Sequence, residues 1–189
     1  LTPQEMEQLA GHGCFVAHCP TSNLKLASGI APVADLLARS VRVALGTDGA
    51  ASNNRLDILR EVRQASLLAK VSSGDAATLP VHQALRMATL DGAAALGLDV
   101  VTGSLLPGKW ADLCSIRLDS WETQPGYDPA SHLIHVAGRE QVANVWVAGK
   151  RRICAGQPVD TPVAKLIGIG NSWHNRLSLR TTGHGPQTQ

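Results

Sequence analysis

Residues 41–54, VRVALGTDGAASNN, are the most informative part of this sequence for its fold. Its first five residues form a short apolar run that predicts a buried β-strand. The run ends at Gly46, and the acidic Asp48 follows within a segment of Gly, Ser and Asn. We expect this carboxylate at the mouth of a buried strand, where it loses solvation unless it is paired or binds a metal. In α/β barrels such strand ends carry the catalytic residues, so the stretch predicts an active site.

A second strand end lies upstream. The apolar residues 14–17 run into His18 and then into a polar segment that contains Asn23. A helix predicted over 32–39 separates the two strands, and this order of strand, loop, helix and strand is typical of a parallel sheet with helical crossovers. Both strands are continuous apolar runs, which predicts that both faces of the sheet are covered.

The pattern of predicted secondary structure changes near Val101. Before it, apolar spacing predicts helices over 2–10, 57–71, 81–89 and 91–96, with a polar loop over 20–29. After it, short apolar runs alternate with Gly and Pro turns. They predict strands over 111–118, 142–147 and 151–155, the last two paired across a turn at Gly149-Lys150. We therefore divide the chain into residues 1–101, a small β domain over 102–160, and a partly helical and then disordered tail over 161–189.

Bulk composition excludes several classes of protein. The 189 residues carry a net charge of +2 and only 17% charged residues, which does not support a nucleic-acid surface. No stretch is long and apolar enough for a membrane span, and no secretory signal opens the chain, so we expect a cytoplasmic protein. The four cysteines form no Cys-x-x-Cys pair, which argues against a disulfide framework or a zinc knuckle. The chain opens without Met at a helix start, as expected for the C-terminal portion of a longer protein.

Five side chains are candidates for the site. Asp48 could ligate a metal and accept a proton from water, or it could instead cap the turn that follows it. His18 could be a core histidine, or it could shape the site from behind. Asn23, Ser52 and Asn53 could bind a polar substrate, or they could serve ordinary turns. No His-x-His, His-x-x-x-His or His-x-x-Glu spacing occurs in the sequence, so this chain alone cannot supply a standard set of histidine ligands.

Four segments together resemble the metal-dependent amidohydrolase superfamily. They are HCPTSNLKLASG (18–29), GTDGAASNN (46–54), GSLLPGKWADL (103–113) and VANVWVAGK (142–150). The branch most similar to them contains the 5′-methylthioadenosine/S-adenosylhomocysteine deaminases and the triazine chlorohydrolases. The resemblance covers roughly residues 1–159.

The resemblance implies an α/β fold in which this chain forms the last two strands and helices of a (β/α)₈ barrel, followed by part of a composite β-sandwich. It also implies one divalent metal, zinc first and iron second. Asp48 matches the family's aspartate ligand, Ser52 matches a serine that faces the substrate, and His18 matches a position that shapes the site. The family's histidine ligands and its proton-donating glutamate have no match here, so the chain by itself is expected to be inactive.

The implied reaction is hydrolytic deamination of an aminopurine nucleoside. A metal-activated water attacks the ring carbon that bears the exocyclic amine, and ammonia leaves. Two alternatives remain open: a triazine or nucleobase amino- or chlorohydrolase of the same superfamily, and a scaffold that assembles without metal. A small-molecule substrate and a homo-oligomer are the expected partners, with no nucleic acid and no membrane.

Overall fold

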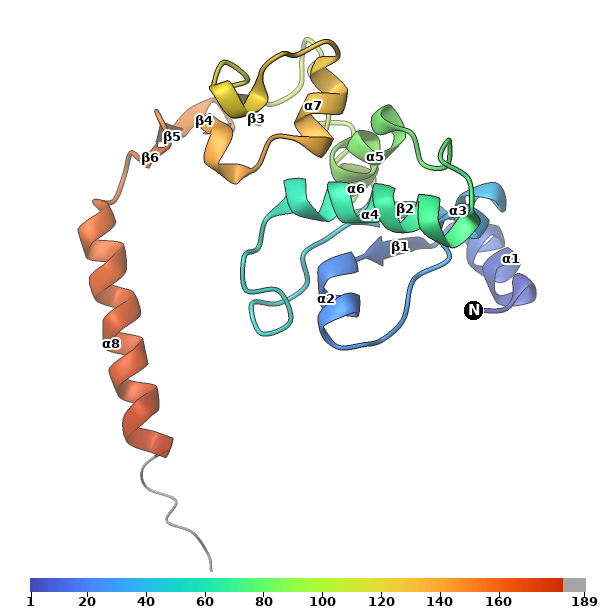
Figure 1. Cartoon of the computed structure of the whole chain (residues 1–189), viewed down its shortest axis with the longest axis horizontal. Helices are drawn as coiled ribbons and strands as arrows, with labels where there is room; N and C mark the ends of the chain where they lie inside the picture. Colours follow the sequence, from blue (N-terminus) through green and yellow to red (C-terminus); the bar gives the residue numbers. More distant parts are fainter. Residues whose placement is uncertain (182–189) are drawn as a thin grey trace, which may run out of the picture.

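The computed structural model describes residues 1–181, which form two neighbouring parts and a projecting helix (Figure 1). In the first part, a parallel pair of strands is flanked by helices. Strand β1 (Phe15–His18) pairs with β2 (Arg42–Leu45), with His18 opposite Leu45. The parallel pairing confirms the expected order of strand, helix and strand, because parallel neighbours need a crossover between them. Helices α1 (Pro3–Gly11), α2 (Pro20–Lys25) and α3 (Val33–Ala38) belong to this part.

Helix α2 is a correction, since the sequence predicted a polar loop over 20–29. Pro20 stands at the first helical position, where its fixed φ favours the helix and its missing N–H is not needed. The backbone N–H of Thr21 donates to the Glu61 carboxylate at 2.9 Å, and Ser22 is buried. Contacts from a distant part of the chain therefore stabilise a turn of helix that local propensity did not favour.

Three further helices cover the strands. They are α4 (Ile58–Ser73), α5 (Val81–Ala88) and α6 (Leu90–Ala95), close to the predicted ranges. Asp57 caps α4 by accepting from the Arg60 N–H, and Gly74 ends that helix in the left-handed conformation. One apolar core joins α4 and α5 to α1, α3 and β2; its fully buried members include Leu36, Val43 and Met87.

The prediction that both faces of the strands are covered is confirmed for residues 43–45 of β2 but not for Ala17 of β1. Val43 and Leu45 pack into the helical core, and Ala44 on the opposite face is also buried. Ala17 of β1, the register partner of Ala44, is exposed. Alternate residues of a strand point to opposite faces and register partners share a face, so the exposure is confined to β1 and does not extend over the whole face.

The second part is an antiparallel sheet in the order β3 (Leu113–Ile116), β4 (Val142–Val147), β5 (Lys150–Cys154) and β6 (Gln157–Pro158). The hairpin between β4 and β5 is confirmed, but its turn residues are Ala148 and Gly149 rather than Gly149-Lys150. Both have positive φ, 48° and 76°, as the commonest two-residue hairpin turns require. All four cysteines of the chain are free thiols.

The same part contains helical elements that the sequence analysis missed. These are α7 (Pro129–His135) and the short 3₁₀ turns η1 (Trp121–Thr123) and η2 (Arg139–Gln141). Ile134 of α7 is fully buried in the core that contains α4 and α5. The Arg63 guanidinium of α4 donates to the carbonyls of Ile134 at 2.8 Å and Ala137 at 2.7 Å. Residues 102–160 therefore share part of their core with the first part.

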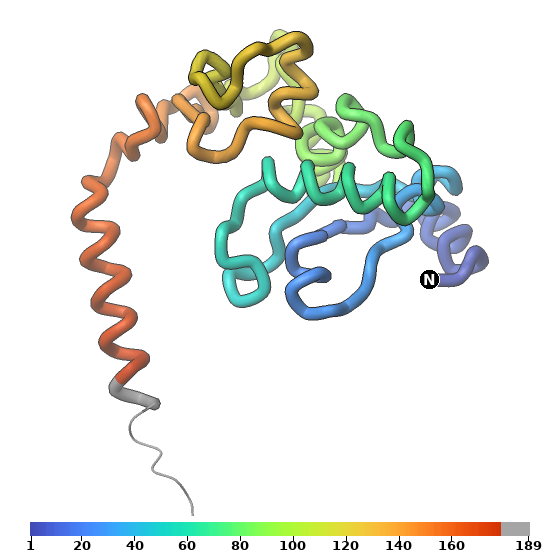
Figure 2. Tube along the Cα trace, in the orientation of Figure 1, coloured from blue at the N-terminus to red at the C-terminus, as the bar shows by residue number. Residues whose placement is uncertain are grey.

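Helix α8 (Val163–Thr181) extends away from both parts, as Figures 1 and 2 show. It is continuous through Gly168 and Gly170, and its residues 163–178 are exposed. The predicted helical character of this region is thus confirmed, whereas the disorder predicted toward the C-terminus falls mainly on residues 182–189, outside the described residues. Within residues 1–181, none of the helices is long and apolar enough to cross a membrane.

Candidate active site at the carboxyl ends of β1 and β2

Asp48 lies three residues beyond β2, in a turn where its carboxylate accepts three hydrogen bonds. Its Oδ2 accepts from the hydroxyl of Ser22 at 2.7 Å and from that of Ser52 at 2.8 Å. Its Oδ1 accepts from the backbone N–H of Gly49 at 2.7 Å. The backbone of Asp48 has φ 58°, in the left-handed region that Asp tolerates better than most residues. Two segments that are distant in sequence thus fix one carboxylate.

The electrostatics of this carboxylate differ from the sequence expectation. The side chain is exposed, so the predicted loss of solvation at the mouth of a buried strand is wrong. The hydroxyls of Ser22 and Ser52 and the Gly49 N–H hold the pKa of Asp48 below its ordinary value, because hydrogen bonds to the charged form favour that form. Asp48 is therefore ionised at neutral pH.

Asp48 fits the role of one metal ligand. A carboxylate offers about four lone-pair positions, and the three hydrogen bonds occupy two on Oδ2 and one on Oδ1. One position on Oδ1 is left for a cation. Within residues 1–181, however, no group of three His, Cys, Asp or Glu side chains is arranged to hold a metal ion. The described chain supplies a single ligand from this edge, and a complete metal site needs more.

His18 is buried rather than open to the site. It is 3% exposed, and its Nδ1 has no hydrogen-bond partner among the described residues. Burial lowers the pKa of His18, while the nearby Glu61 carboxylate acts weakly in the opposite direction. Its backbone carbonyl accepts from the Gly46 N–H at 3.0 Å and links the ends of the two strands. A role in shaping the site stays a prediction.

The three candidate substrate-binding residues are placed differently from one another. Ser52 is 8% exposed and its hydroxyl reaches Asp48. Asn53 is 1% exposed, and its Nδ2 donates to the Thr47 carbonyl at 2.9 Å and to Glu61 at 2.8 Å, which uses both amide hydrogens. Asn23 is half-buried on α2, and its side chain makes no hydrogen bond to other residues of the described range. Contact of Ser52, Asn53 or Asn23 with a substrate stays a prediction.

Sequence reasoning missed two members of the cluster, Ser22 and Glu61. Ser22 stood inside the quoted segment 18–29, but its proximity to Asp48 depends on a contact across 26 positions. Glu61 is 0% exposed and lies on the inward face of α4 beside Val62 and Ala65. An acidic residue within that apolar spacing was a signal that could have been found, because Glu is rarely fully buried without a partner.

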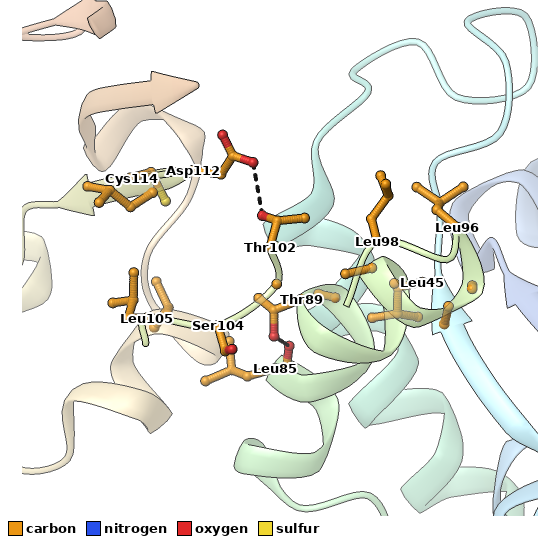
Figure 3. Close-up of a pocket in the computed structure, with 18 of the residues that line it drawn as sticks. Leu45, Leu85, Thr89, Leu96, Leu98, Thr102, Ser104, Leu105, Asp112 and Cys114 are labelled. Carbon is orange, nitrogen blue, oxygen red and sulfur yellow. Dashed lines mark hydrogen bonds between the residues drawn. The ribbon is translucent and has the colours of Figure 1, made fainter. Parts of the chain in front are cut away.

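A separate cavity lies on the face of the strands that carries Ala17 and Ala44. About 800 Å³ is enclosed between Ala17 and Ala44 of the sheet, helix α6 and strand β3. Figure 3 shows its mostly aliphatic lining and the hydrogen bond from the Thr102 hydroxyl to Asp112, 2.9 Å long. Asp48 is not among the residues that line it. Because the cavity lacks clustered catalytic groups, the carboxylate edge is the better candidate for the chemistry.

Comparisons with known proteins agree with this geometry. Residues 1–152 match the model of the Amidohydrolase family. A 5-methylthioadenosine/S-adenosylhomocysteine deaminase of Teredinibacter turnerae is 42% identical over 177 residues, which are 94% of this chain and 40% of that protein. This chain thus spans about two fifths of the length of the relative.

Two solved structures are similar in fold. A crystal structure of an adenosine deaminase from Xanthomonas campestris with bound zinc superposes with a TM-score of 0.92 at 45% identity, covering 95% of this chain and 41% of its own. An atrazine chlorohydrolase from Arthrobacter aurescens complexed with zinc superposes with a TM-score of 0.85 at 28% identity, covering 91% of this chain and 38% of its own. The family model matches well over half of the residues of this chain, so this chain belongs to the amidohydrolase family.

Proposed function

We propose that this chain provides the Asp48 side of an active site that hydrolytically deaminates aminopurine nucleosides of the 5′-methylthioadenosine, S-adenosylhomocysteine or adenosine type. The observation that carries the proposal is the Asp48 carboxylate, fixed by two hydroxyls and one backbone N–H at the carboxyl ends of parallel strands, with one lone-pair position free. Similarity to the T. turnerae deaminase at 42% identity supports the choice of substrate class.

The proposed function is accompanied by a proposed architecture for this mixture of helices and strands. Residues 1–101 would form the C-terminal part of a (β/α)₈ barrel, in which β1 and β2 are the last two strands. Residues 102–160 would contribute to a composite β-sandwich. Parallel pairing of β1 with β2 and the antiparallel order of β3 to β6 support this assignment. Catalytic groups at the carboxyl ends of the strands are the rule for such barrels.

Zinc is the proposed cofactor, with iron as the alternative. Both similar crystal structures described above contain zinc. Asp48 would hold the ion through the free position on Oδ1, and the other ligands would come from beyond the described residues. When bound, a divalent ion supplies Lewis-acid activation of water near neutral pH.

Asp48 would accept a proton from the attacking water and return it to the leaving amine. The hydrogen bonds that lower the pKa of Asp48 keep it ionised in the resting state. One of the two serine hydroxyls would turn away from Oδ2 to leave a lone pair there, and Asp48 would accept a proton from the attacking water at that oxygen. The water oxygen bonds to the ring carbon as the bond to the exocyclic nitrogen breaks. Asp48 then returns the proton to the departing amine, which leaves as ammonia, and the carboxylate is regenerated. The serine hydroxyl that keeps its hydrogen bond would hold Oδ2 in place during both transfers.

The two other hypotheses make different predictions. A triazine chlorohydrolase would use the same attack with chloride leaving, but the similar structure of that class is only 28% identical, against 45% for the adenosine deaminase. A scaffold without metal would bind no zinc and would catalyse nothing. Metal content and substrate preference therefore separate all three.

A chimeric enzyme provides the test. This chain would replace the matching 40% of the T. turnerae relative, and the remainder of that relative would complete the enzyme around Asp48. We expect roughly one zinc per chain, by elemental mass spectrometry, and release of ammonia from methylthioadenosine. Asp48→Asn should lower kcat by about a hundredfold or more, the usual loss on removing a general base.

Asp119→Asn is the matched control, because that side chain is 79% exposed and belongs to the second part. Its kcat should equal that of the unmodified chimera. Near-normal turnover in Asp48→Asn would remove this carboxylate from the mechanism. A folded chimera that holds zinc but hydrolyses only triazines would favour the chlorohydrolase, and a folded chimera without zinc would favour the scaffold.

A further inference from the structure

Glu61 is a fully buried carboxylate that the proposed reaction does not use. It is 0% exposed, and no Lys, Arg or His in the described chain forms an ion pair with it. Neutral donors surround it instead. The Thr21 N–H donates to Oε2 at 2.9 Å, and Nδ2 of Asn53 donates to Oε1 at 2.8 Å. The Thr21 hydroxyl lies 2.5 Å from Oε1 and shares its one hydrogen between that oxygen and the side-chain oxygen of Gln64. Burying a charge in this way is costly, so it calls for an explanation.

Each partner of Glu61 is the chain neighbour of a residue at the candidate site. Thr21 precedes Ser22, whose hydroxyl donates to Asp48. Asn53 follows Ser52, which supplies the second hydroxyl. The Asn53 amide also donates to the carbonyl of Thr47 at 2.9 Å, immediately before Asp48 itself. One buried carboxylate thus anchors α2 through Thr21 and the end of the 47–53 loop through Asn53. Through Asn53 it also helps to hold Thr47, the residue before Asp48.

We infer that Glu61 is a positioning residue, which fixes the two serine hydroxyls on Asp48 from within helix α4. A packed helix is a rigid platform, whereas the segment that carries Asp48 is an exposed turn with a left-handed backbone. Without the anchor, α2 and the loop could shift independently, and a hydrogen bond weakens steeply once its geometry is lost. This inference rests on the proposed function, since it assigns Glu61 to the geometry of the proposed metal-binding carboxylate.

Glu61→Gln is the most direct perturbation, because it keeps the shape of the side chain. A glutamine has one acceptor oxygen and a donating NH₂ group, so at least one of the donors on Thr21 or Asn53 would face another donor. Ser66→Ala is the matched control. Ser66 lies on the same helix, is also 0% exposed, and donates one hydrogen bond, to the Leu79 carbonyl at 3.2 Å, away from the Asp48 turn.

The experiment measures the chain by NMR without metal or substrate. In Glu61→Gln we expect amide hydrogen exchange at Thr21 to accelerate at least tenfold. We also expect the Asp48 carboxyl carbon signal to move toward that of the exposed Asp35. Ser66→Ala should change the exchange rate at Thr21 by less than about twofold and should leave the Asp48 carboxyl carbon signal unshifted. Thr21→Val, which removes one donor only, should cause a smaller carboxyl shift in the same direction and serves if Glu61→Gln does not fold.

Unchanged Thr21 exchange and an unchanged Asp48 signal in Glu61→Gln would overturn the inference, as would equal changes in Ser66→Ala. If only Thr21→Val can be studied, an unshifted Asp48 signal overturns it. The readout involves no turnover, so its failure leaves the proposed deamination untouched. Conversely, a chimera that lacks deaminase activity would refute the proposed function while these signals still decide whether Glu61 positions the serine hydroxyls.

Discussion

Ile134→Ala tests whether residues 102–160 are energetically separate from the first part. Ile134 lies on α7 yet is 0% exposed within the core that also contains Val62 and Met87. The substitution removes three carbons, worth about 0.8 kcal/mol each, or about 2.4 kcal/mol in total. A residual cavity adds to this loss, because close-packed surroundings relax only partly, so the expected cost is about 3–4 kcal/mol.

Urea and thermal unfolding followed by circular dichroism provide the assay. For a chain of this size each kcal/mol shifts Tm by about 2–4 °C, so the expected decrease is roughly 6–16 °C. Val136→Ala is the control, since this neighbour on the same segment is 42% exposed and should change the free energy of unfolding by less than about 0.5 kcal/mol. A cost for Ile134→Ala as small as that of the control would refute the shared core. Two separate transitions, with only one shifted, would refute it as well.

Two further predictions concern the pH dependence of stability and the steric room beside two glycines. Burial lowers the pKa of His18 in the folded state, so the unfolded state binds the proton first; stability from this residue is complete above the ordinary pKa of 6.5 and declines as pH falls below it. His18→Gln should therefore flatten the dependence of unfolding free energy on pH in that range. Gly103→Ala should cost at least about 2 kcal/mol more than Gly97→Ala, because its Cβ would lie 2.6 Å from the Ala93 Cβ, whereas Gly97 has open space.

Each of these has its own control. The pH series compares His18→Gln with the unmodified chain, so that titration of the other histidines cancels; parallel curves would contradict the assigned effect. Both glycines have positive φ, 71° at Gly97 and 84° at Gly103, so backbone strain is similar and the difference isolates the steric contact. Equal losses of stability in the two alanine variants would show that strain alone decides.

Periodicity and turn chemistry predicted most elements of the first part. Helix α1 began where Thr2 and Glu5 form a reciprocal capping box, and the two strands formed where the apolar runs stood. The prediction was weaker after residue 101. Helix α7 has only seven residues and lies among turn signals, and its stability comes from burial of Ile134 and from the Arg63 contacts to the carbonyls of Ile134 and of Ala137, which follows the helix. Such contacts are invisible to a local reading of the sequence.

Residues 41–54 alone were enough to predict an aspartate that follows a buried strand within a Gly-rich turn, because the apolar run and the turn residues are both local features. Only the tertiary structure decided what surrounds that carboxylate. Ser22 reaches Asp48 across 26 positions, and Glu61 reaches Thr21 across 40. Parallel pairing of β1 with β2 brings their carboxyl ends to one edge, and the packing of α4 buries Glu61 behind it. Hydrogen bonds between such distant residues depend on the assembled core, which no local pattern encodes.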